Sequence, residues 1–295
     1  MLKFLVIVLL IIGIFFRFTN LDRKVYSYDE AITSLRISGY TWTEMVKQDF
    51  QGKVISVADL QTKYQQINPE KNLINTIKGL AAEEPQLTPL YFTLSRFWVK
   101  LFGPKVAVTR SLSALISLLI FPSIYWLCLE LFQSSLIGWI AIAIISVSPF
   151  HILYAQDARP YMLLAVTILL SSGALLRAIR LNTKTTWIIY AATLPLGLYS
   201  HLLFTLVAAA HGIYVIAIEK FQFTQKLRAY LVALTGGILT FSPWILVLIL
   251  NAHEVRETVG LPQLSLSVLS SVNLWILMLG RIFLDTHWAG GVLKF

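Results

Sequence analysis

Residues 230–250 read YLVALTGGILTFSPWILVLIL, and no charged side chain interrupts the run. A helix needs about 20 apolar residues to cross the hydrocarbon core of a bilayer, so this run predicts a membrane span. The adjacent Gly236 and Gly237 within it indicate close packing against another helix. Further apolar runs lie at about 111–132, 136–153, 161–179, 186–200, 202–218 and 266–284. Together these runs predict an all-α polytopic membrane protein.

The composition supports this class. The chain has 295 residues, of which 57% are hydrophobic, and its charged share of 13% is about half that of a typical soluble chain. The net charge of +9 comes from Lys and Arg residues that lie between apolar runs, a pattern typical of membrane topology and anionic lipid contact and not of nucleic-acid binding. The single cysteine, Cys128, lies within an apolar run, so a disulfide framework and a thiol-based metal site are excluded.

The chain divides into three parts. Residues 1–16 are expected to form a first transmembrane helix with a cytoplasmic N-terminus, because no small-x-small cleavage site of a signal peptide, the alternative, precedes Arg17. Residues 17–108 form a long extracytoplasmic loop that contains most of the acidic residues and is expected to be functional. Residues 109–295 form a transmembrane helical bundle.

The basic connections predict the topology. Those at Arg177–Lys184 and Lys220–Arg228 should be cytoplasmic. They reach that side only if the short, aromatic-rich segment 87–102 lies in the membrane interface and does not cross. The prediction is therefore about eight transmembrane helices, with interfacial helices in the first outer loop. A single span over 186–219 is the alternative that would invert the topology after it.

Asp29 and Glu30 follow the first apolar run at the predicted water–lipid boundary. Charged groups beside a bilayer are costly and tend to be functional. A carboxylate suits the base that takes the proton of an acceptor hydroxyl as a glycosidic bond forms. The alternative is a structural cap at a helix start, where an acidic side chain is favoured by the helix dipole.

A second polar group, Gln156-Asp157-Ala158-Arg159-Pro160-Tyr161, follows another predicted span. Pro160 suits the first turn of a helix. The free N–H groups of that turn, together with Arg159, would bind an anion such as phosphate. Asp157 would pair with Arg159 or orient it. The alternative is an interfacial Arg–Asp pair flanked by belt tyrosines.

A third group covers Glu83 to Tyr91, where the carboxylates of Glu83 and Glu84 are expected to reach back toward Asp29; a solvated acidic turn is the alternative. His201, at a tight outer turn, is a further binding candidate or an interfacial residue. His201 and His211 lack the spacing of a zinc site, and no metal site is predicted. Carboxylates suit Mg²⁺ or Mn²⁺, but no arrangement in the sequence requires either ion.

The order of these motifs resembles the polytopic glycosyltransferases of the GT-C type. The features are a first helix, D-E in the following loop, P-L-Y before an amphipathic helix that ends in F-G, and Q-(D/E)-A-R-x-Y after a later span. The sequence resembles, more narrowly, the family of protein O-mannosyltransferases and lipid A aminoarabinose transferases, in its bacterial glycosyltransferase branch. The resemblance extends from the N-terminus to about Trp244.

The resemblance implies a GT-C-like bundle and a sugar donor carried on a polyprenyl phosphate. Transfer to a lipid, glycan or protein acceptor would occur on the extracytoplasmic face of the cell (inner) membrane. Asp29 falls on the family's catalytic acidic position, with Glu30 beside it. Asp157 falls on the second acidic position, and Arg159 and Tyr161 on the phosphate-side pattern.

Two features depart from the family pattern. Leu87-Thr88-Pro89-Leu90-Tyr91 stands where relatives usually have H-P-P-L-Y, which puts a contact to acceptor or ion in doubt. The sequence also stops at Phe295, soon after the eighth predicted span, whereas relatives usually carry several more, so a truncated product is one expectation.

The leading hypothesis is an inverting sugar transfer in which Asp29 is the base and Arg159 binds the donor phosphate. Glu30, Asp157 and Tyr161 would shape the site, with Glu84, Tyr91, Gln156 and His201 as further binding candidates, and the lipid tail would lie in a groove between helices. Binding the charged leaving group lowers the barrier without a protonating acid. One alternative is a transporter of lipid-linked sugar, which predicts ionisable residues in mid-span. The other is a non-catalytic or truncated partner of a full-length transferase.

Overall fold

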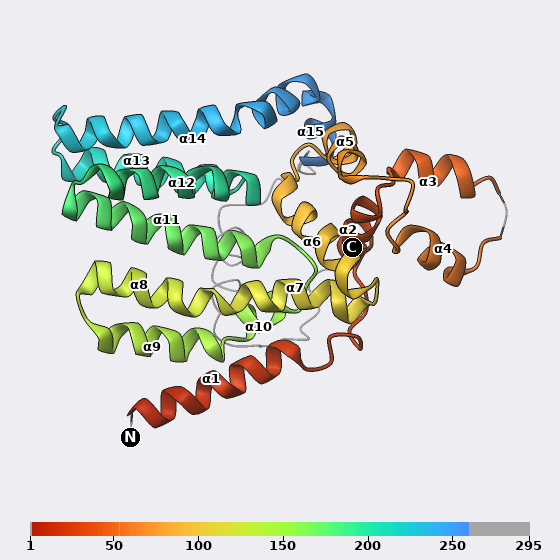
Figure 1. Ribbon diagram of the computed structural model, residues 1–295, viewed down its shortest axis with the longest axis horizontal. Helices are drawn as coiled ribbons and strands as arrows, with labels where there is room; N and C mark the ends of the chain where they lie inside the picture. The colour runs from red at the N-terminus through yellow and green to blue at the C-terminus, as the bar shows by residue number, and fades with distance from the viewer. Residues whose placement is uncertain (1, 53, 260–295) are drawn as a thin grey trace, which may run out of the picture.

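The computed structural model describes residues 2–52 and 54–259, and the described residues form helices and no strand (Figure 1). The helices are α1 (Leu2–Phe18), α2 (Tyr28–Ser38), α3 (Trp42–Asp49), α4 (Val57–Tyr64), α5 (Leu73–Glu83), α6 (Pro89–Phe102), α7 (Val106–Leu118), α8 (Ile120–Phe132), α9 (Ser135–Ser146), α10 (Pro149–Ala155), α11 (Tyr161–Leu181), α12 (Lys184–Ser200), α13 (Phe204–Ile218), α14 (Gln225–Leu250) and α15 (Ala252–Val259). The span predicted at 266–284 lies outside the described residues. The predicted all-α class is confirmed.

Three helical stretches of the described chain are long and apolar enough to cross a membrane: Val106–Phe132, Tyr161–Leu181 and Gln225–Leu250. The pair α9 and α10 would add a fourth, although the two helices are bent by 64° where they meet. Phe4–Phe18 and Phe204–Ile218 are apolar but shorter. The predicted count of about eight spans is therefore not confirmed, whereas the membrane character is.

The structure divides the span predicted at 136–153 into two helices, α9 and α10, with a bend between them. Pro149 is the first residue of α10. A proline has no N–H to continue the helical hydrogen bonds and its ring clashes with the preceding turn, so a helix that meets one ends or kinks there. The separation of 186–200 from 202–218, in contrast, is confirmed, because α12 ends at Ser200 and α13 begins at Phe204.

The bundle helices lie alongside one another, and the connections α8–α9, α11–α12 and α13–α14 share one end (Figure 1). Buried residues of α11, α12, α13 and α14 form the largest apolar core, which extends to α6. The predicted close packing holds at Gly237, where an added Cβ would lie 2.7 Å from the Leu194 Cβ; at Gly236 nothing lies within 4 Å.

The segment between α1 and α6 lies at the other end of the bundle, where α3 and α4 project furthest from it (Figure 1). It is not an irregular loop, because capping side chains begin its helices: Ser27 caps α2 and Thr41 caps α3. Helix α6, predicted not to cross the membrane, is not a candidate span. It packs between the bundle and helices α2 and α5.

Candidate functional site

Two of the predicted polar groups meet in space. The backbone N–H of Ala158 donates to Glu30 Oε1 at 3.0 Å, across 128 positions of sequence. Arg159 Nη1 donates to the backbone carbonyl of Asp29 and to Thr33 Oγ1, each at 3.3 Å. The start of α2 and the turn before α11 therefore form one site.

The start of α2 gives its two acidic residues different environments. Ser27 is the N-cap: its side chain accepts from the Glu30 N–H, while the Ser27 N–H donates to Glu30 Oε2 at 3.0 Å. This reciprocal capping box fixes where the helix begins. Glu30 is buried and Asp29 is exposed. The Asp29 carboxylate has no hydrogen bond within the described part of the chain, so it is free to meet a ligand.

Glu30 forms a buried ion pair with Arg110 of α7. Arg110 Nε and Nη2 donate to the two carboxylate oxygens at 2.7 Å each, and the side chains are 1% and 2% exposed. Burial by itself raises the pKa of Glu30, but hydrogen bonds from Arg110, Ser27 and Ala158 outweigh it and lower that pKa below its usual value. Glu30 is thus ionised and fully engaged with protein groups.

Arg110 also orders the chain that leads into α2. It donates to the carbonyls of Leu21 at 2.7 Å, Lys24 at 3.1 Å and Val25 at 2.9 Å. Sequence reasoning missed this residue. Its signal was an arginine at the start of a long apolar run, since a charge at the edge of a span needs a partner.

Asp157 is half-buried and lies near the charged groups of Glu30 and Arg159. Its carboxylate has no hydrogen bond among the residues described. Burial and the nearby Glu30 raise its pKa to about 6, while Arg159 and Lys24 act in the opposite direction. A carboxylate with this pKa changes its charge close to neutral pH.

Arg159 is 7% exposed and has unused hydrogen-bonding capacity. Its Nε is buried without a hydrogen-bond partner among the described residues. The guanidinium lies 5.9 Å from the centre of the Tyr161 ring. That ring is in turn 6.2 Å from the ring of His201, whose Nδ1 accepts from the Leu203 N–H. Burial, together with the charge of Arg159, lowers the pKa of His201, so its imidazole is neutral at pH 7.

Gln156 and Tyr91, two further predicted binding residues, have structural contacts. Gln156 Nε2 donates to the carbonyls of Phe16 at 2.6 Å and Thr19 at 3.0 Å, at the end of α1. Tyr91 is fully buried, and its hydroxyl lies 2.7 Å from Ser113 Oγ, which donates to the Arg159 carbonyl at 3.4 Å. Both residues hold the turn that carries Arg159.

Glu84 was expected to reach back toward Asp29, and this expectation is wrong. Arg36, buried in the second half of α2, donates from Nε to Glu84 at 2.7 Å and pairs through Nη1 with Glu83 at 2.6 Å. Arg36 is seven residues beyond Asp29, about 10 Å along the helix. A buried guanidinium must be paired, and these two carboxylates meet that need.

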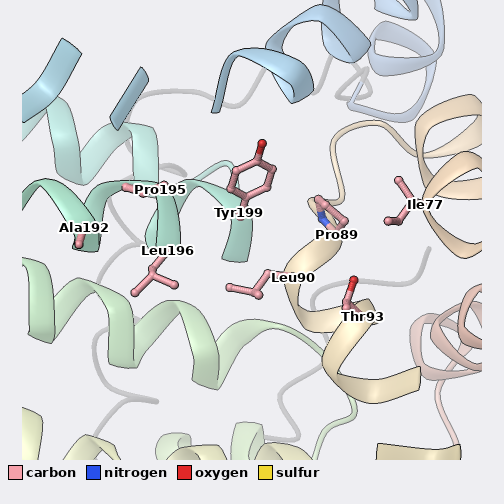
Figure 2. Close-up of a pocket in the computed structure, with 8 residues that line it drawn as sticks. All are labelled: Ile77, Pro89, Leu90, Thr93, Ala192, Pro195, Leu196 and Tyr199. Atoms are coloured by element: carbon pink, nitrogen blue, oxygen red, sulfur yellow. The ribbon is translucent and has the colours of Figure 1, made fainter. Parts of the chain in front are cut away.

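Within the part of the chain that the structure describes, no three His, Cys, Asp or Glu side chains gather in a way that could hold a metal ion. An apolar groove of about 510 Å³ lies between α6 and α12 (Figure 2). It is lined by Ile77, Pro89, Leu90, Thr93, Ala192, Pro195, Leu196 and Tyr199.

Comparison with known families decides the class. Residues 84–247, more than half of the chain, match the model of the dolichyl-phosphate-mannose-protein mannosyltransferase family. The chain belongs to this family. It is therefore a mannosyltransferase-like membrane glycosyltransferase, as the order of its motifs predicted. No curated protein and no solved structure matches it significantly.

The dolichyl-phosphate-mannose-protein mannosyltransferase match covers only part of the site. It includes Arg110 and the turn with Asp157 and Arg159, and it begins after Asp29 and Glu30. The contacts from Arg110, Ala158 and Arg159 link the start of α2 to the matched region.

Proposed function

We propose that the protein transfers a sugar from a polyprenyl-phosphate donor to a hydroxyl group of a lipid, glycan or protein acceptor, with inversion at the anomeric carbon. The acceptor oxygen attacks that carbon, the bond to the phosphate oxygen breaks, and the phosphate leaves with the electron pair. Asp29 takes the acceptor proton and Arg159 binds the phosphate. The observation that carries the proposal is Arg159, buried, short of partners and hydrogen-bonded to the Asp29 backbone.

Arg159 suits an anionic ligand. A buried donor without a partner costs about 1–3 kcal/mol, and a phosphate oxygen would remove that cost at Nε. The planar guanidinium presents its donors as a fork that matches phosphate. Because negative charge grows on the leaving phosphate during transfer, a cation fixed beside it stabilises the transition state more than the bound donor.

Asp29 is the better base of the two adjacent carboxylates. Glu30 has both oxygens engaged by Arg110, and by Ser27 and Ala158. Asp29 is exposed, and its carboxylate accepts no hydrogen bond from the described residues. Only a carboxylate with a free oxygen can approach a ligand hydroxyl closely enough to accept its proton. Glu30 instead positions Asp29 against Arg159.

The groove between α6 and α12 suits the lipid tail of the donor. Its walls are apolar, and Tyr199 at one side is two residues from His201. His201 packs near Tyr161, and the Tyr161 ring lies near the Arg159 guanidinium. A lipid whose phosphate contacts Arg159 would therefore have an apolar surface for its first isoprene units nearby.

The distribution of charge supports an extracytoplasmic site. The basic connections, Arg177–Lys184 and Lys220–Arg228, lie at the end of the bundle opposite α2 and α6 (Figure 1). Short basic loops remain in the cytoplasm. The end with Asp29 and Arg159 would then face the other side of the cell membrane.

The proposal is tested with radiolabelled polyprenyl-phosphate sugars and membranes that contain equal amounts of each variant. Asp29→Asn should lower transfer by about 10²-fold or more. Asp22→Asn, which changes an exposed carboxylate in the same connection, is the matched control. Arg159→Lys keeps the charge but loses the fork, and should lower kcat/KM for the donor about tenfold or more.

Equal turnover by wild type and Asp29→Asn would remove Asp29 from the role of base. A folded wild-type protein that transfers no sugar from any donor, but co-purifies with a full-length transferase, would favour the non-catalytic partner.

A further inference from the structure

Two large aromatic side chains lie exposed beside Asp29. Tyr28 is the residue before it and is 71% exposed, and Trp42 at the start of α3 is 42% exposed. Their ring centres are 6.4 Å apart, with the rings inclined at 66°. Tyr28 directly precedes Asp29 in the first turn of α2, so the two residues are about 3.8 Å apart at Cα.

The backbone beneath both rings is held rigidly. The Trp42 and Thr43 N–H groups donate to the Glu83 carboxylate at 2.7 and 2.9 Å, and Glu83 is itself paired with the buried Arg36. Tyr28 is the first residue of α2, whose start is fixed by the capping box. A surface that is already ordered loses little entropy when it binds a ligand.

The size of this surface limits what binds there. This surface presents two aromatic rings, of which Tyr28 is 71% and Trp42 42% exposed. A stable protein interface needs about 800 Å² from each partner, far more than these side chains supply. A lipid chain is also a poor match, because α3 lies on the side of α2 that faces away from the bundle (Figure 1).

A pyranose ring has the right size and chemistry. One of its faces presents C–H groups, which carry a small positive charge, and its rim presents hydroxyl groups. The face of an aromatic ring carries negative charge and attracts such C–H groups, while the hydroxyls stay in water. Two inclined rings would contact both the face and the edge of one sugar.

We propose that Tyr28 and Trp42 form a binding platform for a hexopyranose ring beside Asp29. This proposal rests on the proposed transferase function of the same site. The ring is either the sugar of the lipid-linked donor or a sugar of a glycan acceptor, since both present the same C–H face.

Binding is tested on the purified full chain with methyl mannopyranoside and methyl glucopyranoside, by saturation-transfer NMR. Tyr28→Ala and Trp42→Ala should each weaken binding about tenfold. Tyr28→Phe and Trp42→Phe keep an aromatic face and should bind nearly as well as wild type. Phe50→Ala, at an exposed aromatic residue next to α3, is the control that should change nothing. Thermal unfolding of each variant checks that it is folded.

Sorbitol has the hydroxyls of a hexose but no ring face, and should not compete. Equal binding by wild type and folded Tyr28→Ala, or equal competition by sorbitol, would overturn the platform. Loss of binding in Tyr28→Phe would also do so, because it would show that the hydroxyl and not the ring makes the contact.

Kinetics then identify the source of the sugar. A raised KM for the donor in Tyr28→Ala assigns the ring to the donor, and a raised KM for a glycan acceptor assigns it to the acceptor. Glycoside binding does not require turnover, so aromatic-dependent binding without transfer would reject the transferase and keep the platform. Transfer with an unchanged KM for both substrates and unchanged glycoside binding would reject the platform alone.

Discussion

The Glu30–Arg110 pair shows how single residues position this site. Each partner is nearly fully buried, and each uses its charged atoms within the pair and on nearby backbone groups. A buried ion pair adds little net stability, but removal of one partner leaves an uncompensated charge in an apolar environment. The pair therefore fixes the start of α2 against α7, and replacement of either side chain should be strongly destabilising.

Arg110→Ala should lower the free energy of unfolding by about 3–5 kcal/mol, because Glu30 would remain buried without its cation. Arg110→Lys should recover only part of this loss, since an ammonium group cannot make the forked contact. Thermal unfolding in detergent measures both. Arg23→Ala, at an exposed arginine just before α2, should leave the unfolding temperature unchanged. Unfolding of Arg110→Ala at the wild-type temperature would show that the pair is not a structural requirement.

The raised pKa of Asp157 predicts that binding of the proposed donor depends on pH. Its pKa is raised to about 6, so the side chain is neutral below this pH and negatively charged above it. A negative charge beside Arg159 opposes a phosphate ligand. The proposed donor is a phosphodiester, whose charge would be constant over this range. The KM for the donor should therefore rise as pH increases through about 6.

Asp157→Asn removes this titration, so its donor KM should stay flat between about pH 5 and 8. The measurement is donor KM against pH for the two proteins under the same conditions. Parallel curves would show that Asp157 does not cause the pH dependence. The raised pKa also means that ionised Asp157 costs folding stability, which Asp157→Asn should restore above pH 6.

At this scale the sequence marked two polar motifs, but it did not show which side chains contact each other. Asp29, Asp157 and Arg159 became candidates because they lie in short motifs, and the structure brings these two motifs together. The ion pair to Arg110 was missed because its partner lies 80 positions away. Glu84 was misplaced because the sequence does not show which of several cations a carboxylate will meet.

Among the helices, α12 and α14 give a direct test of packing. Gly236 and Gly237 are neighbours on α14 but face different surroundings: an added Cβ meets nothing at the first and the Leu194 side chain at the second. In a helix interior, alanine is more favourable than glycine by about 0.5–1 kcal/mol where space permits. The two positions therefore differ only in whether there is room for an added methyl group.

Gly236→Ala should raise the unfolding temperature slightly, and Gly237→Ala should lower it, because its Cβ would lie 2.7 Å from Leu194 Cβ. Parallel thermal unfolding of the two variants is the measurement, and each serves as the control for the other. The same direction of change in both would contradict the contact between α12 and α14.

The apolar runs predicted which segments are helices, but they did not always predict where one helix ends and the next begins. The run 136–153 has the length of one span, but Pro149 divides it into α9 and α10. The polar interval after α1 contains several short capped helices, whose apolar positions are too few to stand out in the sequence.

For the whole molecule, the two ends of the bundle are predicted to lie on opposite sides of the membrane. Cys128 is buried, and its replacement by serine gives a background without cysteine. In that background, Asp22→Cys near the site should react with a membrane-impermeant maleimide in intact cells. Lys220→Cys, in the connection before α14, should react only after lysis. The reverse pattern would place the site in the cytoplasm.

The contacts of Glu30 also constrain when this protein can become active during synthesis. Asp29 leaves the ribosome early, but the groups that bind the adjacent Glu30 are 80 and 128 positions after Glu30 in the chain. A nascent chain that has not yet reached Arg159 carries the acidic residue without the cation opposite it. The chemistry proposed for Asp29 would therefore wait until α7 has been inserted and the turn before α11 has emerged.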